Sequence, residues 1–120
     1  MKKVVAALFI SALFLTGCSS TSASVSNLGA TEFLEKASTK DVVLIDVRTP
    51  GEFAEGNIVN ALNIDVQSSS FDSQIAQLDP TKTYALYCRS GNRSGIAAEK
   101  MADAGFTFIY NATVGFTDLA

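Results

Sequence analysis

The apolar run Val42–Val47, interrupted only by Asp46, is the feature that most constrains how this chain can fold. Its residues do not alternate between apolar and polar, and such strands are typical of parallel sheets buried on both faces. The segment Arg48–Gly51 follows, and its Pro and Gly end the strand. A second apolar run, Tyr84–Tyr87, leads into Cys88. Two buried strands in 120 residues favour a single domain built around a parallel sheet.

The segments around these runs alternate between helical and extended patterns. Helical spacing of apolar residues marks the helices, and short apolar runs between turns mark the strands. The expected helices span residues 30–37, 71–78 and 94–104, with a turn or helix at 52–56, and the further strands span 58–64 and 106–110. Gly105 is placed to end the last helix. This alternation predicts an α/β fold with a mainly parallel sheet.

The first 18 residues have the pattern of an export signal. Met1–Lys3 is positively charged, and Val4–Leu15 is an apolar run too short for a stable membrane span but suited to a signal peptide. The end of this stretch, Leu15-Thr16-Gly17-Cys18, resembles the lipobox of bacterial lipoproteins, in which cleavage precedes a lipid-carrying Cys. We therefore expect a signal peptide over residues 1–17 and a lipid anchor on Cys18 at a membrane surface. The alternative is a soluble secreted protein with an ordinary thiol at this position.

This resemblance implies a location in the bacterial cell envelope. Ser19, which follows the lipobox Cys, favours an outer membrane anchor facing the periplasm if the source is Gram-negative. Residues 18–28 are polar and rich in Ser, so we expect a flexible tether there. Residues 29–120 are then expected to form the folded domain.

Charge and histidine content narrow the choice of partners. Residues 18–120 carry seven Lys and Arg against twelve Asp and Glu, a formal net charge of −5, which argues against nucleic acid and anionic lipid headgroups. The absence of histidine excludes a Cys–His pair and a His-dependent metal site, and we expect neither metal nor cofactor. If Cys18 is lipidated, Cys88 lacks an intramolecular partner. A free thiol in an oxidising compartment suggests sulfur chemistry.

The polar loop after the second strand is the strongest candidate site. It places Cys88 at the N-terminus of a helix, with Arg89 and Arg93 nearby. Cations, the positive end of a helix dipole and loop N–H groups all favour a thiolate, and they also favour a bound anion. The alternative is a buried Cys on an ordinary strand-to-helix turn. Asp46 and Arg48 follow the other strand, so they are expected at the same sheet edge, where such folds bind ligands.

Two motifs give the chain a resemblance to a known family. The first runs from Asp46 to Phe53 and continues through Gly56-Asn57-Ile58 to Ala61–Ile64, and the second is Cys88–Ser94. With the order of strands and helices, residues 29–120 resemble the single-domain rhodaneses. The resemblance implies a rhodanese-like α/β fold, in which a central, mainly parallel sheet has helices on both faces.

Three positions depart from the family pattern. Asn57 stands where His is common, and Asn60 stands where Gly is common. The usual Gly-Gly near the C-terminus is reduced to Val114-Gly115-Phe116, without the nearby Trp. These differences lie outside the cysteine loop, so they bear on substrate preference and C-terminal packing more than on the chemistry.

The resemblance also implies a mechanism. Cys88 would take a sulfane sulfur from a small anionic donor such as thiosulfate and pass it to a thiol or cyanide, or to an unidentified protein acceptor. Arg93 is expected to clamp the anion, with a weaker contribution from Arg89 at the pocket mouth. Asp46 would pair with an arginine or loop amides, and Arg48 would either contact substrate or form a structural salt bridge. The expected anion loop comprises Arg89, Ser90, Gly91, Asn92, Arg93 and Ser94, of which Ser94 would cap the helix.

Other functions share parts of this pattern. Phosphatases and arsenate reductases also place a thiolate in an arginine-bearing loop, but the related phosphatases have five residues between Cys and Arg, whereas four separate Cys88 from Arg93. The shorter loop favours a pocket for sulfur over one for phosphate. A membrane-tethered sulfur carrier or partner-binding module is the other alternative. The intact Cys88 and both arginines argue against a purely structural role.

Overall fold

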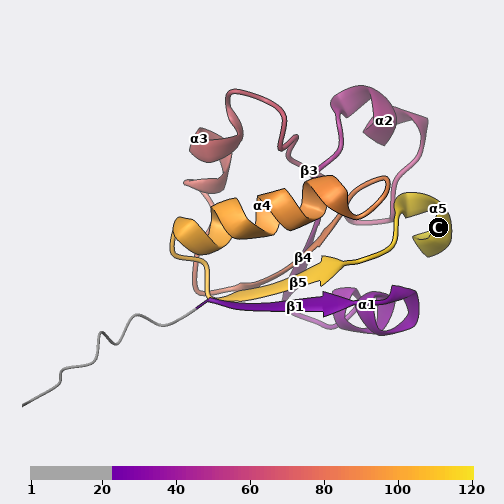
Figure 1. Cartoon of the computed structure of the whole chain (residues 1–120), viewed down its shortest axis with the longest axis horizontal. Helices are drawn as coiled ribbons and strands as arrows, with labels where there is room; N and C mark the ends of the chain where they lie inside the picture. Colours follow the sequence, from indigo (N-terminus) through magenta and orange to yellow (C-terminus); the bar gives the residue numbers. More distant parts are fainter. Residues whose placement is uncertain (1–22) are drawn as a thin grey trace, which may run out of the picture.

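The computed structural model describes residues 23–120, and in them five strands form one parallel sheet (Figure 1). The strands lie in the order β1-β5-β4-β2-β3, and every pairing between them is parallel. Their bounds are β1 Ser24–Leu28, β2 Val42–Asp46, β3 Leu62–Asn63, β4 Thr83–Tyr87 and β5 Phe108–Ala112. The parallel α/β fold predicted from the two apolar runs is confirmed.

Helices cover both faces of the sheet. One apolar cluster joins the sheet to α3 and α4, and a second joins its other face to α1 and α5. Figure 1 shows α4 above the sheet and α1 below it, with α2 and α5 at the end toward which the strands point. The bounds are α1 Ala30–Ala37, α2 Pro50–Glu55, α3 Phe71–Ile75, α4 Asn92–Asp103 and α5 Phe116–Leu119. The two-sided arrangement explains why β2 and β4 are apolar without alternation.

Local sequence explains where two of the helices begin and end. Gly105 follows the end of α4 with φ of +100°, a backbone conformation that side chains other than Gly rarely adopt, and so ends the helix as predicted. Thr49 caps the start of α2: its side chain accepts a hydrogen bond from the Glu52 N–H, while the Glu52 side chain accepts one from the Thr49 N–H. This capping box, with Pro50 in the first turn, shows that the Pro-Gly pair starts a helix as well as ending a strand.

The prediction of a flexible tether over residues 18–28 is wrong for residues 24–28. These residues form β1, which pairs with β5 from Ser24 opposite Phe108 to Leu28 opposite Ala112. β1 is an edge strand in which only Leu28 is buried, so its polar composition did not reveal it. The expected signal peptide, Cys18 and the first part of the tether lie outside the described residues.

Other predicted bounds need smaller corrections. The strand expected over residues 58–64 is shorter and comprises only β3, Leu62–Asn63. The helix expected over residues 71–78 ends at Ile75. The strand expected over 106–110 begins later, at Phe108, and a final helix, α5, forms where a short tail was expected. Ala104, expected on the apolar face of α4, is exposed beyond the helix end. Apart from α5, which is a whole element that was not expected, these differences lie at element ends, where fraying makes sequence patterns least informative.

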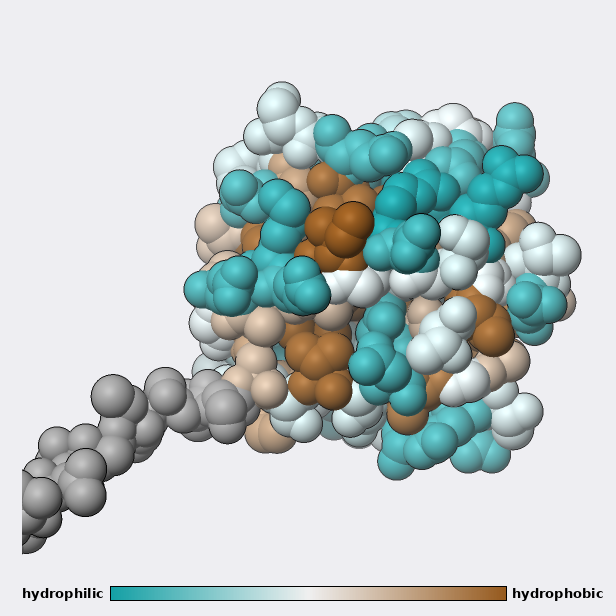
Figure 2. All heavy atoms as spheres, viewed as in Figure 1, coloured by the Kyte–Doolittle hydropathy of each residue, from teal (hydrophilic) through white to brown (hydrophobic). Residues whose placement is uncertain are grey.

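The surface of the domain is mostly polar. Figure 2 shows apolar residues in small, separate patches between hydrophilic ones on the face in view. The large apolar side chains with most exposure are Val25, Val59, Leu62, Ile96 and Phe108. Within residues 23–120, no helix combines the length and apolar character needed to cross a membrane.

Candidate active site

Cys88 lies directly after β4, at the carboxyl end of the sheet. Its side chain has no exposed surface and belongs to the apolar cluster beneath α4. Its carbonyl oxygen accepts a hydrogen bond of 2.9 Å from the Phe116 N–H, which ties the loop to the start of α5. In this conformation the sulfur is therefore not in contact with solvent. The expected position of the thiol, at a strand end and before a helix, is confirmed.

The loop surrounds the sulfur with hydrogen-bond donors. The Gly91 N–H donates to Sγ of Cys88 at 3.0 Å, and Oγ of Ser94 lies 3.4 Å from Sγ. Burial raises the pKa of the Cys88 thiol, but hydrogen bonds from Ser94, Ser90 and Gly91 outweigh it and bring the pKa below its ordinary value. The loop alone therefore favours a thiolate, in a protein that has no histidine to act as a base.

Ser94 plays a different part from the predicted helix cap. The capping position of α4 is Gly91, and Ser94 is the third residue of the helix, completely buried. Its hydroxyl lies 3.2 Å from the Gly91 carbonyl and 3.4 Å from the Ala112 carbonyl, as well as near the sulfur. Ser94 therefore links the thiol to both the loop and the end of β5.

Two glycines let the loop pack against the segment after β5. Gly91 has φ of +93°, and a Cβ there would lie 2.6 Å from the Thr113 carbonyl oxygen. A Cβ on Gly115 would lie 1.6 Å from the Arg89 carbonyl oxygen, which leaves no room for any side chain. The single glycine kept from the family's C-terminal pair is therefore the one that the loop requires.

Asp46 and Arg48 form a buried ion pair beside the loop. Nη2 of Arg48 lies 2.6 Å from Oδ2 of Asp46, and the two side chains are 5% and 0% exposed. Arg48 also donates to the Gly56 carbonyl at 2.6 Å, and its guanidinium carbon lies 4.2 Å from the centre of the Phe116 ring. Of the alternatives left open by the sequence, the geometry favours an Asp46–arginine pair and a structural salt bridge for Arg48.

Arg93 is held by a carboxylate that the sequence reasoning missed. Its Nη1 and Nη2 lie 2.7 and 2.9 Å from Oε1 and Oε2 of Glu52 in α2. These bonds, with smaller contributions from Thr49, lower the pKa of Glu52 to about 2. The expected anion clamp is thus already engaged by the protein itself. The Thr49-x-x-Glu52 capping box was the sequence signal that could have identified Glu52 as an ordered side chain.

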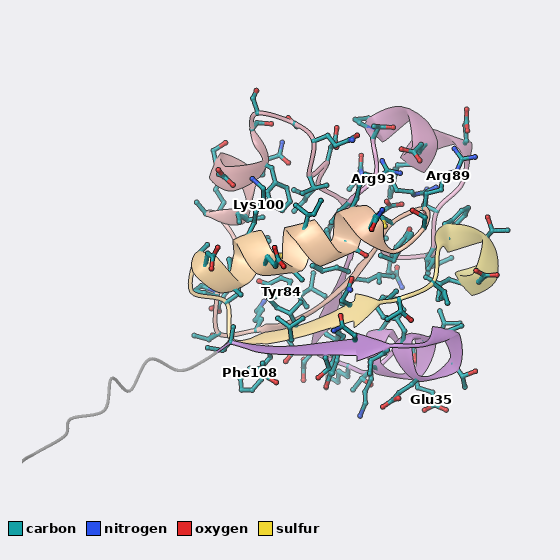
Figure 3. All side chains as sticks on the ribbon, in the orientation of Figure 1. Glu35, Tyr84, Arg89, Arg93, Lys100 and Phe108 are labelled. Atoms are coloured by element: carbon teal, nitrogen blue, oxygen red, sulfur yellow. The ribbon has the colours of Figure 1, made fainter. Side chains whose placement is uncertain are left out.

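The remaining loop residues lie at the surface of the domain. Arg89 and Ser90 are exposed, and Asn92 begins α4. Figure 3 places Arg89 and Arg93 together near α2. A neighbouring cavity of about 250 Å³ is lined by Arg48, Glu52, Glu55, Gly56, Arg89, Phe116 and Thr117. Of the predicted site residues, Arg48 and Arg89 therefore line this cavity, whereas Gly91 and Asn92 line a different one, beside β1.

The two asparagines that depart from the family pattern have local structural roles. Asn57 donates from its side chain to the Phe53 carbonyl at 2.9 Å, just after the end of α2. Asn60 has φ of +73°, a conformation that favours Gly but that Asn adopts more readily than most residues. Neither Asn57 nor Asn60 is among the residues that line the cavity beside the loop.

The fold and the site define a parallel α/β domain with a buried cysteine in a loop of hydrogen-bond donors, and comparison with known proteins identifies its family. The model of the rhodanese-like domain matches residues 29–120, so the chain belongs to the rhodanese-like family. The chain is 38% identical to the uncharacterized protein YqhL of Bacillus subtilis over 81 residues, which cover 68% of this chain and 63% of YqhL. It is 33% identical to the thiosulfate sulfurtransferase PspE of Escherichia coli over 76 residues, which cover 63% of this chain and 72% of PspE.

Solved structures agree with this assignment. A rhodanese-related protein from Thermoplasma volcanium superposes with a TM-score of 0.67 at 29% identity, covering 78% of this chain and 89% of that one. A rhodanese with anions from E. coli superposes with a TM-score of 0.56 at 30% identity, covering 66% of this chain and 92% of that one. The rhodanese-like fold implied by the two sequence motifs is confirmed.

Proposed function

We propose that this chain is a sulfurtransferase that carries a sulfane sulfur as a persulfide on Cys88. The observation that carries the proposal is a buried sulfur within reach of loop donors, to which the Gly91 N–H donates at 3.0 Å and near which the Ser94 hydroxyl lies at 3.4 Å. Loop hydrogen bonds of this kind lower the pKa of the thiol and so stabilise a thiolate without a general base. The same donors would stabilise the terminal sulfur of a persulfide. Relatives named as thiosulfate sulfurtransferases, such as PspE, support the same chemistry.

The first half-reaction transfers one sulfur atom. The Cys88 thiolate attacks the sulfane sulfur of a donor such as thiosulfate, a new S–S bond forms, and the S–S bond of the donor breaks. Sulfite leaves with the electron pair, and the negative charge of the thiolate passes to the terminal sulfur of the persulfide. Both sides of this step carry the same total charge, so no proton or oxidant is required.

The second half-reaction returns the enzyme to its starting state. A thiolate or cyanide attacks the terminal sulfur, the S–S bond to Cys88 breaks, and the Cys88 thiolate leaves with the electron pair. Cyanide then becomes thiocyanate, and a thiol becomes a persulfide. A protein thiol could serve as the acceptor by the same step, which would make the domain a sulfur carrier for a dedicated partner.

Phosphoryl chemistry fits this loop less well. Four residues separate Cys88 from Arg93, and the guanidinium of Arg93 faces Glu52. A phosphoryl group needs several donors around its equatorial oxygens, so a shorter loop with an occupied arginine is poorly suited to it. Cys88–Ser94 also lacks Asp and Glu, so the loop supplies no acid for a leaving group.

We also propose that Cys18 carries a lipid that anchors the domain at a membrane of the bacterial cell envelope, with residues 1–17 removed. The lipobox-like sequence supports this, and β1 begins only six residues later, at Ser24. An anchored domain would lie close to the membrane surface. Incorporation of labelled fatty acid should be lost in Cys18→Ser, and incorporation that survives this change would refute the anchor.

Intact-mass spectrometry of residues 18–120 after incubation with thiosulfate tests the proposed activity. We expect the mass to increase by one sulfur atom, and we expect cyanide to remove that sulfur as thiocyanate. Cys88→Ser should gain no sulfur while keeping the circular dichroism and melting curve of the folded domain. A wild-type protein that gains no sulfur from thiosulfate, thiosulfonate or persulfide donors would refute the proposal.

A further inference from the structure

Glu52 accepts hydrogen bonds from the guanidinium nitrogens of Arg93 to which an anionic substrate would otherwise bind. Nη1 and Nη2 of Arg93 reach the two carboxylate oxygens of Glu52 at 2.7 and 2.9 Å. This forked geometry is the one in which a guanidinium binds carboxylates and other oxyanions. The arginine of the thiol loop therefore holds an anion before any donor arrives, and that anion belongs to α2.

The ion pair adjoins the loop that holds the sulfur, because Arg93 follows Cys88 by five residues in the first turn of α4. The hydrogen bonds that Arg93 donates to Glu52 are the largest cause that raises the pKa of Arg93, and the negative charges of the Cys88 thiolate and Asp65 raise this pKa further. The side chains of Arg93 and Glu52 are only 19% and 20% exposed, so water and salt screen the pair less than they would at an open surface. The negative charge of Glu52 therefore contributes to the electrostatic potential at the thiol loop.

We propose that Glu52 is a specificity-determining residue, which neutralises Arg93 and so shifts donor preference from dianionic thiosulfate toward monoanionic sulfane donors such as thiosulfonates and persulfides. This inference rests on the proposed sulfur transfer at Cys88. Glu52 acts through Arg93 and through its own charge, and it takes no part in making or breaking bonds.

The charge of the donor is what the site would discriminate. In both cases Sγ of Cys88 attacks the sulfane sulfur and the S–S bond of the donor breaks. Sulfite leaves from thiosulfate with the electron pair, and a sulfinate leaves from a thiosulfonate in the same way, so total charge is conserved. A carboxylate at a fixed distance repels a dianion about twice as strongly as a monoanion.

Glu52→Gln removes this charge with little change in shape. A capping box accepts Gln in place of Glu, so the start of α2 at Thr49 should be preserved. Gln can also accept one hydrogen bond from Arg93, so the side chain of Arg93 should remain near its present position. The variant therefore changes the charge beside the loop and leaves the loop itself, including Cys88, intact.

Steady-state kinetics with thiosulfate and benzenethiosulfonate, at low ionic strength, test the proposal. In Glu52→Gln we expect KM for thiosulfate to fall about three- to tenfold, and KM for the thiosulfonate to fall by about the square root of that factor. Added salt should reduce the difference between the variant and the wild type. A thiosulfate KM that rises or stays within twofold, or an equal change for both donors, would overturn the proposal.

Glu35→Gln is the control, because it makes the same charge change away from the loop and its cavity. Glu35 is exposed and belongs to α1, on the opposite side of the sheet from α2 and Arg93 (Figure 3). Its variant should change the ratio of the two KM values less than twofold, and an effect equal to that of Glu52→Gln would contradict a role exerted through Arg93.

Thiosulfate binding keeps this test separate from the proposed function. In a Cys88→Ser background no sulfur can be transferred, so calorimetry with thiosulfate reports binding alone. Tighter binding after Glu52→Gln in that background supports the role of Glu52 even if the wild type fails to transfer sulfur. Normal sulfur transfer with an unchanged donor ratio and unchanged binding would refute the role of Glu52 and leave the sulfurtransferase proposal standing.

Discussion

Two arginine–carboxylate pairs lie at the carboxyl end of the sheet, and they differ in their exposure to water. Arg48 and Asp46 are 5% and 0% exposed, and Arg48 is held in addition by the Gly56 carbonyl and the Phe116 ring. Arg93 and Glu52 are 19% and 20% exposed and meet each other across the gap between α2 and α4. One pair lies in the interior and the other at the mouth of the site.

This difference separates a structural role from a role in binding. A buried charge that loses its partner has no water to replace it, so breaking the Arg48–Asp46 pair is expected to destabilise the domain strongly. A partly exposed arginine can exchange a carboxylate for another anion at little cost, so the Arg93–Glu52 pair is the one that we propose responds to substrate. The same residue types therefore hold the loop in one place and adjust its charge in the other.

The largest effect should come from breaking the buried pair. Asp46→Asn leaves the charge of Arg48 uncompensated in the interior, and we expect it to reduce the free energy of unfolding by about 3 kcal/mol or more. Glu52→Gln removes the equivalent charge from the other pair and should cost about 1 kcal/mol or less. Urea denaturation of both variants measures the two values. Equal losses of unfolding free energy in the two variants would show that burial does not make one pair more important for stability than the other.

The partly exposed pair should matter more for kinetics than for stability. We expect Arg93→Ala to change the free energy of unfolding by about 1 kcal/mol or less, because the pair is partly open to water. It should raise KM for thiosulfate about tenfold or more, since charge-assisted hydrogen bonds to an anion are strong. Donor saturation curves on the folded variant provide the test. An unchanged KM would remove Arg93 from the donor site.

A smaller effect should show that loop hydrogen bonds, and not the two arginine–carboxylate pairs, lower the pKa of the Cys88 thiol. The pKa of Cys88 is raised by burial and lowered by loop hydrogen bonds, of which those from Ser94 come first. Ser94→Ala should therefore raise the thiol pKa, move the acid limb of the pH profile of kcat/KM to higher pH, and reduce activity severalfold at neutral pH. Arg93→Ala should move that limb less. If Arg93→Ala moves it further, the arginine rather than the loop activates the sulfur.

The smallest effect concerns stability in acid. Arg93 lowers the pKa of Glu52 from its ordinary value of 4.5 to about 2, so Glu52 stabilises the fold above pH 4.5 and loses that contribution as the pH falls through about 2. The small stability difference between the wild type and Glu52→Gln should therefore be present at neutral pH and disappear near pH 2. Urea denaturation at several pH values measures it. A difference that does not depend on pH would contradict an ionised Glu52 in this pair.

The parts of the site that depend on local sequence could be predicted, and the parts that depend on packing between elements could not. Cys88 follows a buried strand and precedes a helix, and both patterns are local and strong. The bond between Arg93 and Glu52 spans 41 positions and joins two helices, so no spacing in the sequence indicates it. Likewise, the sequence left open whether Arg48 contacts substrate or forms a structural salt bridge, and only its burial against Phe116 favours the second role.

The same difference between local sequence and packing explains why the central strands were predicted correctly and the edge strand β1 was missed. The central strands β2 and β4 are apolar because both of their faces are covered, so their sequences identify them. The edge strand β1 buries only Leu28 and is held by backbone pairing with β5, so its Ser and Asn residues resemble a linker. An edge strand needs little apolar surface, and sequence patterns therefore detect it poorly.

The most direct test of sulfur transfer through Cys88 follows the two sulfur atoms of thiosulfate separately. The domain is incubated with thiosulfate labelled in either the outer or the inner sulfur, and the peptide that contains Cys88 is isolated without reduction. We predict that the outer label stays on Cys88 as a persulfide and that the inner label leaves as sulfite. Inner label on the peptide, or outer label that remains after Cys88→Ser, would contradict the account.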